Sequence, residues 1–388
     1  MKPIKRCGLL LLACSVLLMT GCWDRREIND VGFVLATAVD LEDDGKYRVT
    51  VQISLPGQMG GASGGGGGTG GDKSYYIDSD TGKTVGDAIN KMQNRMSRFM
   101  TTSHVRVNII GEELAKKEGI VNIFASMGRG TEFRLSSYMI IAKGKGYDLL
   151  NAEPKFERFP AEALRELVKP LQITVKDVAD SMSIEGQDSM IPYMGVVESQ
   201  KGAKPSKEIS FEGYALFDQG KMTGNLSGGN AVALGFLTNR RVAFTTLQIT
   251  KDESIELFVT GGRLKIKSKL VRNKPEFDIH ASAAVTIVEN ESMMDVTHQS
   301  NNRKIEEKLS KQFEVKMTQM LAQLQENKSD AVGFGRVISR EFPGEWKRMK
   351  NNWKEQGFPN SKFHVHVSTN ITRSGLISEN IVKKEPKL

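Results

Sequence analysis

One cysteine stands where its thiol group could carry a lipid. The segment Met19-Thr20-Gly21-Cys22 ends a short apolar run that follows the positive residues Lys2, Lys5 and Arg6. Such a run is too short to span a bilayer and is typical of a secretory signal. Small residues before a cysteine are the layout of a bacterial lipobox, although leucine is usual where Met19 stands. We therefore predict a signal peptide over residues 1–21 and acylation of Cys22. The alternative is an ordinary signal peptide with an incidental cysteine.

The cysteine count agrees with this use of Cys22. Cys7 and Cys14 lie inside the predicted signal peptide, so the mature chain keeps one thiol. That chain can form no internal disulfide and no cysteine-based metal site. Acyl chains on Cys22 would hold the protein on a membrane, since each buried methylene contributes about 0.8 kcal/mol. No later stretch of the sequence approaches the ~18 consecutive apolar residues of a transmembrane helix.

The histidines form no recognisable catalytic or metal-binding pattern. His364 and His366 share one face of an expected strand with Ser368 and Asn370, which favours a solvated polar face over a metal site. The others are His104, His280 and His298. The sequence contains no HExxH motif and no supported Ser/His/Asp arrangement. We predict no catalytic residue, no metal and no cofactor beyond the covalent lipid on Cys22.

A glycine-rich tract, residues 60–71, produces motif matches without the structure that they need. Nine of its twelve residues are glycine, so we expect a flexible loop within a hairpin. Gly61–Gly65 spells G-x-S-x-G, but a nucleophile elbow needs a strand-to-helix turn. Gly82-Lys83-Thr84 ends like a phosphate loop, yet Ile77 occupies the position of the required glycine.

Four cations alternate with apolar residues along a later segment. Arg263, Lys265, Lys267 and Lys269 would therefore line one face of a strand. Two interpretations stay open. The cations form a solvated face that discourages strand pairing, or they contact acidic lipid headgroups, cell-wall polymer or an acidic partner.

The composition describes an ordinary globular body. The chain has 388 residues, of which 39% are hydrophobic and 26% are charged. Removing residues 1–21 takes away three positive charges and lowers the formal net charge from +8 to +5. An exported lipoprotein has little access to nucleic acid, so we expect no nucleic-acid partner and a mild preference for anionic surfaces.

The elements that must position these residues mix strands and helices in the first half of the chain. We expect strands over residues 31–39, 47–53, 74–77, 105–109 and 137–142. We expect helices after Thr84, over 112–117, over 120–127 and after Pro160. This order predicts an N-terminal α/β domain over residues 22–199.

The second half favours an antiparallel sheet packed on a long helix. Residues 200–207 are polar and contain Gly202 and Pro205, so they are the candidate linker. The C-terminal domain then covers residues 208–378. An alternative division makes residues 208–250 a separate small subdomain of it. The expected elements are a hairpin over 211–226, strands over 255–271 and 276–288, a helix with an apolar stripe from Ile305 to Leu324, a helix capped by Ser329 and a strand from Phe363 to Ile371. The fold class is a multi-domain α+β body.

Two tryptophans follow in helical surroundings. Trp346 and Trp353 are seven residues apart and so lie on nearly the same helix face. We predict that Trp346 or Trp353 anchors the core of the C-terminal domain. The alternative is that they contact a partner, since tryptophan is common in interface hot spots.

Together these residues resemble the Ger(x)C family, the lipoprotein C subunits of spore nutrient germinant receptors. The resemblance rests on Gly21–Ile28, Glu212–Phe217, Lys221–Leu226, Asp330, Phe334-Gly335, Arg340–Pro343, Trp346, Trp353 and Ile371–Leu376. The glycine-rich tract and Met19 depart from the family pattern.

The resemblance implies a body that its lipid holds on the outer face of the spore inner membrane. The implied partners are an integral-membrane A subunit and a transporter-like B subunit, which with the C subunit convert nutrient binding into release of dormancy. The resemblance implies no enzyme activity and leaves small-molecule binding open. The alternative is an extracytoplasmic solute-binding lipoprotein that feeds a transporter.

Overall fold

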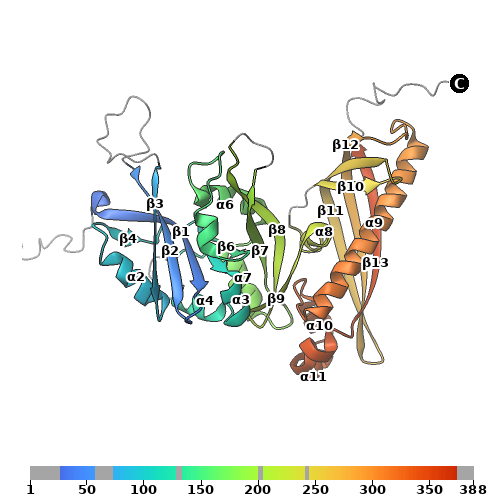
Figure 1. Ribbon diagram of the computed structural model, residues 1–388. Coiled ribbons are helices and arrows are strands. Elements are labelled where there is room, and N and C mark those ends of the chain that lie inside the picture. Colours follow the sequence, from blue (N-terminus) through green and yellow to red (C-terminus); the bar gives the residue numbers. More distant parts are fainter. Residues whose placement is uncertain (1–26, 57–72, 128–132, 200–203, 241–243, 374–388) are drawn as a thin grey trace, which may run out of the picture.

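Within the described residues, the chain forms two β-sheets with helices packed against them (Figure 1). The computed structural model describes residues 27–56, 73–127, 133–199, 204–240 and 244–373. Within these ranges no helix is long and apolar enough to cross a membrane. Cys22 and the glycine-rich tract at 60–71 lie outside the described residues, so acylation and the flexible loop stay predictions.

The first sheet has nine strands of mixed direction. They are β1 (Val31–Leu41), β2 (Tyr47–Ser54), β3 (Tyr75–Gly82), β4 (Phe99–Thr101), β5 (Val107–Gly111), β6 (Tyr138–Ala142), β7 (Met190–Glu198), β8 (Lys207–Asp218) and β9 (Lys221–Leu226). Their order is β3-β2-β1-β5-β6-β7-β8-β9, and β4 pairs with β1. The central strands β1, β5, β6 and β7 run parallel, so long connections that include helices join them.

Short helices accompany this sheet. They are α2 (Val85–Gln93), α3 (Glu112–Lys117), α4 (Val121–Met127), α5 (Gly146–Leu150), α6 (Pro160–Val168) and α7 (Val175–Ser183), with 3-10 turns at Ile28–Asp30 and Lys169–Leu171. Local sequence sets the helix starts. Thr84 caps α2, and Thr174 forms a capping box with Asp177 at the start of α7. The strands and helices predicted for this half are present, whereas β4, α5, α7 and β7 were not predicted.

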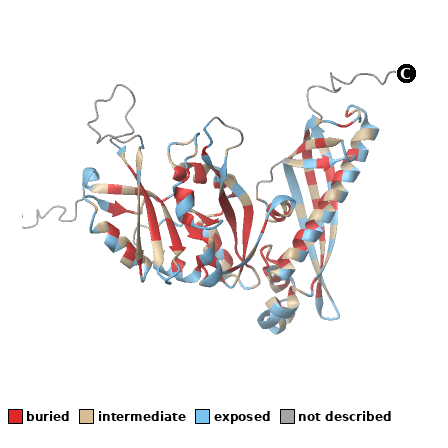
Figure 2. Ribbon diagram, viewed as in Figure 1, coloured by how far each residue is buried: buried red, intermediate tan, exposed pale blue. Residues whose placement is uncertain are grey.

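The second sheet has four strands in the order β10-β11-β12-β13. They are β10 (Phe244–Gln248), β11 (Ser254–Val271), β12 (Lys274–Asn290) and β13 (Lys362–Arg373). The helices of this half are α8 (Gly228–Leu237), α9 (Gln299–Glu326), α10 (Phe334–Glu341) and α11 (Pro343–Met349), followed by a 3-10 turn at Lys350–Asn352 and a π-helical turn at Trp353–Gly357. The long α9 runs along the sheet (Figure 1), and its buried residues follow the predicted stripe from Ile305 to Leu324 (Figure 2).

One strand pair of this sheet differs from the predicted antiparallel arrangement. β12 and β13 run parallel, with Glu276 opposite Lys362 and Val285 opposite Ile371. The segment with α9, α10 and α11 carries the chain back to the end of the sheet at which β12 began. A strand that follows such a return pairs in parallel.

The break between the two sheets comes later in the chain than predicted. β7 and β8 form an antiparallel hairpin that starts from the pair Glu198 and Lys207, so the predicted linker at 200–207 joins neighbouring strands. β8 and β9 complete the first sheet, while β10 belongs to the second, which divides the predicted subdomain 208–250. A polar hairpin loop and an interdomain linker have similar compositions, because the backbone of both is exposed to solvent.

Candidate functional site

Two of the five histidines lie apart, and the other three lie close together on neighbouring strands. The ring of His104 packs edge-to-face on Phe33, with centroids 4.7 Å apart. Nδ1 of His298 lies 2.9 Å from a carboxylate oxygen of Asp295. The remaining three, on β12 and β13, are His280, His364 and His366. The described part of the chain contains no group of three His, Cys, Asp or Glu side chains placed to hold a metal ion.

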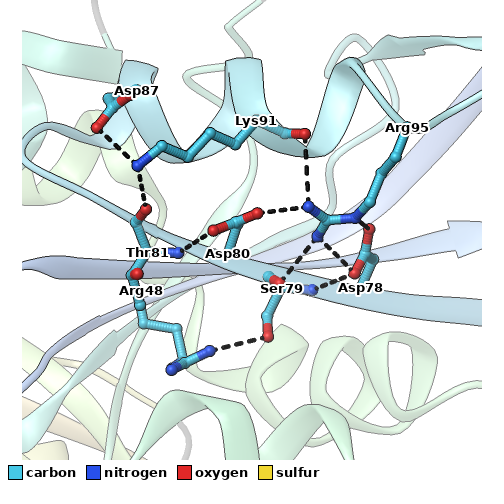
Figure 3. Close-up of polar contacts among 8 residues, drawn as sticks. All are labelled: Arg48, Asp78, Ser79, Asp80, Thr81, Asp87, Lys91 and Arg95. Carbon is cyan, nitrogen blue, oxygen red and sulfur yellow. Dashed lines mark hydrogen bonds and ion pairs between the residues drawn. The ribbon is translucent and has the colours of Figure 1, made fainter.

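The segment that ends like a phosphate loop starts a helix that is fixed to the first sheet. The hydroxyl of Thr84 accepts a hydrogen bond from the backbone N–H of Asp87 at 3.1 Å. Beyond the other end of α2, Arg95 donates to both carboxylate oxygens of Asp78, at 2.9 and 2.8 Å, and also bonds Asp80 (Figure 3). The bond to Arg95 lowers the pKa of Asp80. These contacts hold α2 on β3, which is a structural role.

A buried polar cluster, which we call the junction, joins the two sheets. It consists of Asp188, Asp218, Asp330, Trp353 and Lys354. Asp188 precedes β7, and Asp218 ends β8 in the first sheet. The other three residues follow α9 and α11 in the second half of the chain. Asp330 is fully buried and Asp188 is 7% exposed, so these carboxylates need partners inside the protein.

Asp330 accepts hydrogen bonds from the backbone N–H groups at the start of α10. Its carboxylate accepts four hydrogen bonds, from the backbone N–H groups of Gly333 at 2.9 Å, Phe334 at 2.8 Å and Gly335 at 2.8 Å, and from Nε1–H of Trp353 at 3.0 Å. The first N–H groups of a helix have no partner within the helix, so a carboxylate there stabilises it. The prediction that Ser329 caps this helix is wrong. Gly333 precedes it with a φ of 84°, and Asp330 supplies the acceptor.

Asp188 and Lys354 extend the junction across the boundary. Oδ2 of Asp188 accepts the backbone N–H of Asp330 at 2.7 Å, and the N–H of Asp188 donates to the carbonyl of Asp330 at 2.9 Å. The ammonium group of Lys354 contacts Asp188 and lies 2.9 Å from Oδ1 of Asp218. One cation from the second half of the chain therefore serves two carboxylates that flank strands of the first sheet.

Burial governs how the junction titrates. It raises the pKa of Asp330 to about 6, against the opposing effect of the N–H groups of Gly335 and Phe334. Burial also raises the pKa of Asp188, and the charge of Lys354 opposes that shift. A raised carboxyl pKa often marks an active site. Here four donors already occupy the oxygens of Asp330, so the arrangement stabilises the boundary between the sheets.

Both tryptophans pack at the junction. Trp346 and Trp353 are 6% and 1% exposed, and their rings meet edge-to-face with centroids 5.4 Å apart. This burial confirms the prediction of core anchors. Two glycines make the close approach possible, since a Cβ atom on Gly335 would lie 2.6 Å from the Cα atom of Gly186. Residues 184–187 were not predicted to take part, because nothing in their local sequence points to a partner so distant in the chain.

The predicted row of cations lies on an open sheet face. We call this the cationic face, and it consists of Arg263, Lys265, Lys267 and Lys269 on β11, of Glu276, Asp278, His280 and Ser282 on β12, and of Lys362, His364, His366 and Ser368 on β13. The alternate residues of these strands point toward the helical layer and are more buried. The parallel β12–β13 pairing brings the three histidines into this face.

A cavity of about 790 Å³ lies between the end of α8 and β11. Its lining includes Phe236, Asn239, Arg240 and residues 258–264. Among these lining residues there are two arginines and no histidine, cysteine or carboxylate. Such a lining suits an anion more than a cation, and it offers no side chain for general base catalysis.

Two family models match the chain in succession. One, described as a spore germination protein N-terminal domain, matches residues 24–196. The other, described as spore germination B3/GerAC like, C-terminal, matches residues 212–375. The two matches meet near the β7–β8 loop, although the first sheet continues through β9.

Proteins of Bacillus subtilis (strain 168) are similar along nearly their whole length. YfkR is 31% identical over 389 residues, which cover 98% of this chain and 99% of that protein. Spore germination protein KC is 27% identical, with 96% and 97% covered. Spore germination protein B3 is 23% identical, with 94% and 96% covered.

A solved structure shares the fold. The crystal structure of the GerBC protein superposes with a TM-score of 0.58 and covers 87% of this chain and 96% of that chain. The sequences are 20% identical, so this likeness concerns the arrangement of the chain alone.

Proposed function

The chain belongs to the Ger(x)C family of spore germination proteins, and from this premise we propose that it is a lipid-anchored, non-catalytic subunit of a spore nutrient germinant receptor. The observation that carries the proposal is the match of spore germination models to both halves of the chain. The full-length similarity to KC and B3 supports a role for the whole protein rather than for one domain.

In this proposal Cys22 carries the lipid, and the body stands on the outer face of the spore inner membrane. The partners are an integral-membrane A subunit and a transporter-like B subunit of the receptor. The chain needs no further membrane segment, because acyl chains on Cys22 suffice for stable anchoring.

The structure supports a role in assembly through its junction. Asp330, Asp188 and Lys354 tie the two sheets together with buried, paired groups, so the sheets form one unit. A unit of this kind holds two surfaces at a fixed spacing, which suits a subunit that contacts more than one partner. The groups most perturbed by burial at this boundary are engaged in these contacts, which favours a structural use over a catalytic one.

The second candidate function is solute binding for a transporter. Solute-binding lipoproteins usually have two similar α/β lobes, whereas the two sheets here have nine and four strands and different helical layers. The cavity beside Arg240 is where a solute would bind under that alternative. Neighbouring genes distinguish the two candidates, since receptor A and B genes support the first and permease and ATPase genes support the second.

The anchoring experiment compares Cys22→Ala with Cys14→Ala in sporulating cells. We expect Cys22→Ala to move the protein from the membrane fraction to the soluble fraction and to slow nutrient-triggered germination. Cys14→Ala changes a residue of the predicted signal peptide and should leave both unchanged. Mass spectrometry of the membrane-bound protein should find acyl chains on an N-terminal Cys22. An unmodified mature N-terminus would refute the lipid anchor.

A further inference from the structure

The cationic face is open and built from aligned rows of polar side chains. Lys265 lies opposite His280, which lies opposite His366, and the two histidine rings stack with centroids 5.1 Å apart. The neighbouring row places Lys267 opposite Asp278. The side chains that β11 and β13 contribute to these rows are exposed, since α9 packs on the other side of the sheet.

The charge on this face is unbalanced, and the imbalance is greatest at one end. Five fixed cations face two carboxylates on the three strands, which leaves a net charge of +3 with neutral histidines. The carboxylates of Glu276 and Asp278 lie within ion-pair distance of Lys269. Within the described residues, Arg263, Lys265 and Lys267 have no carboxylate at that distance.

The hairpin that ends the face adds further charge. β11 and β12 meet in a tight turn in which Arg272 and Asn273 both have positive φ, 50° and 65°. Arg272 and Lys274 are exposed at this tip, and beside them Val271 is 42% exposed. The tip therefore carries an exposed aliphatic side chain and two exposed cations.

The side chains of the face suit a layer of phosphate groups better than a protein. The cores of protein interfaces are depleted of lysine and enriched in aromatic side chains. The four rows contain four lysines, one arginine, three histidines, two carboxylates and two serines, and no large apolar side chain. Long, flexible lysine side chains on a sheet face can adjust to lipid headgroups that change position. The phosphates of anionic lipids attract such cations at close range.

We propose that the cationic face docks onto the anionic headgroups of the membrane surface. The proposal rests on the proposed function only in that a membrane lies nearby, because the contact is independent of the lipid on Cys22. It gives the protein a second attachment in its C-terminal half, which would fix the orientation of the body. The competing explanation is that the cations only protect the part of β11 that extends beyond β10 as a free edge.

The test measures co-sedimentation with vesicles of phosphatidylglycerol and phosphatidylcholine. The protein is the chain from residue 22 with Cys22→Ser, so no acyl chain contributes. The test variant combines Arg263→Gln, Lys265→Gln and Lys267→Gln. The control variant combines Lys155→Gln, Lys176→Gln and Lys347→Gln, which removes three exposed cations that, within the described residues, also have no carboxylate at ion-pair distance.

We expect the unsubstituted protein to bind the anionic vesicles and not vesicles of phosphatidylcholine alone. Each cation at an anionic surface strengthens partitioning by about fivefold, so the test variant should bind roughly 100-fold more weakly, while the control should stay within about threefold. Added salt should weaken binding of the unsubstituted protein. If the test variant does not fold, Lys265→Gln alone should still lower partitioning by about fivefold. Equal losses in both variants, no loss in the test variant, or no binding by the unsubstituted protein would overturn the proposal.

Discussion

Two hydrogen bonds join Asp188 to the backbone of Asp330 across 142 positions of sequence. The carboxylate of Asp188 accepts the N–H of Asp330, and the carbonyl of Asp330 accepts the N–H of Asp188. The carboxylate of Asp330 is then free to receive the N–H groups at the start of α10. The boundary between the sheets therefore depends on a few buried polar groups.

Replacing Asp330 should destabilise the whole protein. Asp330→Ala leaves the backbone N–H groups of Phe334 and Gly335 and the indole N–H of Trp353 buried without their acceptor, which should lower the free energy of unfolding by roughly 3–5 kcal/mol. The control Asp252→Ala removes an exposed carboxylate and should change it by less than about 0.5 kcal/mol. Urea unfolding measures both values. Similar values for the two variants would show that the junction contributes little.

The contact between Gly186 and Gly335 should tolerate no side chain. Gly335→Ala places a Cβ atom 2.6 Å from the Cα atom of Gly186 and 2.7 Å from Nε1 of Trp353, so it should cost roughly 1–3 kcal/mol of stability. Gly344 is the matched control, because it lies in helix α11 and a Cβ atom there meets nothing within 4 Å. Gly344→Ala should be neutral or stabilising by up to about 1 kcal/mol. Thermal unfolding followed by circular dichroism ranks the two variants, and the reverse order would contradict the close approach.

Truncating Trp353 should cost much more than truncating an exposed aromatic residue. Trp353→Ala removes a ring that is 1% exposed together with a donor to Asp330, and it should lower stability by roughly 3–5 kcal/mol. Phe156 is 99% exposed, so Phe156→Ala should have almost no effect on stability. If Trp353→Ala keeps normal stability and loses only receptor assembly, the tryptophan serves an interface and not the core.

Stability should increase when the pH falls from 7.5 to 5. Burial raises the pKa of Asp330 to about 6 and also raises the pKa values of Asp188 and Asp40. A carboxyl whose pKa is higher in the folded protein than in the unfolded chain stabilises fully below the unfolded value of about 4, and this stabilisation is lost as the pH rises through the folded value. For Asp330 alone, a folded pKa of about 6 makes the difference between pH 7.5 and 5 about 1.4 kcal/mol.

Urea unfolding at pH 5, 6 and 7.5 measures this dependence. Asp330→Asn has no titrating carboxyl and should show a shallower change over the same range. Below pH 4 stability should fall again, because the pKa of ion-paired carboxylates such as Asp80 is lowered and their protonation breaks the pairs. A stability that increases steadily from pH 5 to 7.5 would contradict the assigned direction for Asp330.

Local patterns predicted the elements, and their limits explain what was missed. The alternation of Phe277, Ile279 and Ala281 identifies a half-buried strand, and the stripe that begins at Ile305 identifies α9, because burial on one face leaves a period in the sequence. The parallel pairing of β13 leaves no such period. It follows from where the chain returns after three helices, and it decides that His366 lies beside His280.

The junction could be predicted only in part. Asp330 belongs to the family resemblance, yet its neighbour Ser329 has the same local propensity to cap a helix. What distinguishes Asp330 is its contact with Asp188 and Trp353, and pairings over such distances depend on the packed structure. The hairpin loop between β7 and β8 was taken for a linker for the same reason, since the partner strand is not visible in the loop itself.

We propose above that this chain acts by assembly with the membrane subunits of a germinant receptor. Affinity purification of the C-terminally tagged protein from detergent-solubilised spore inner membranes, followed by mass spectrometry, tests it directly. We predict that an integral-membrane A subunit and a transporter-like B subunit co-purify with the protein in comparable amounts. Recovery of the protein alone, or together with a permease and an ATPase, would contradict the claim.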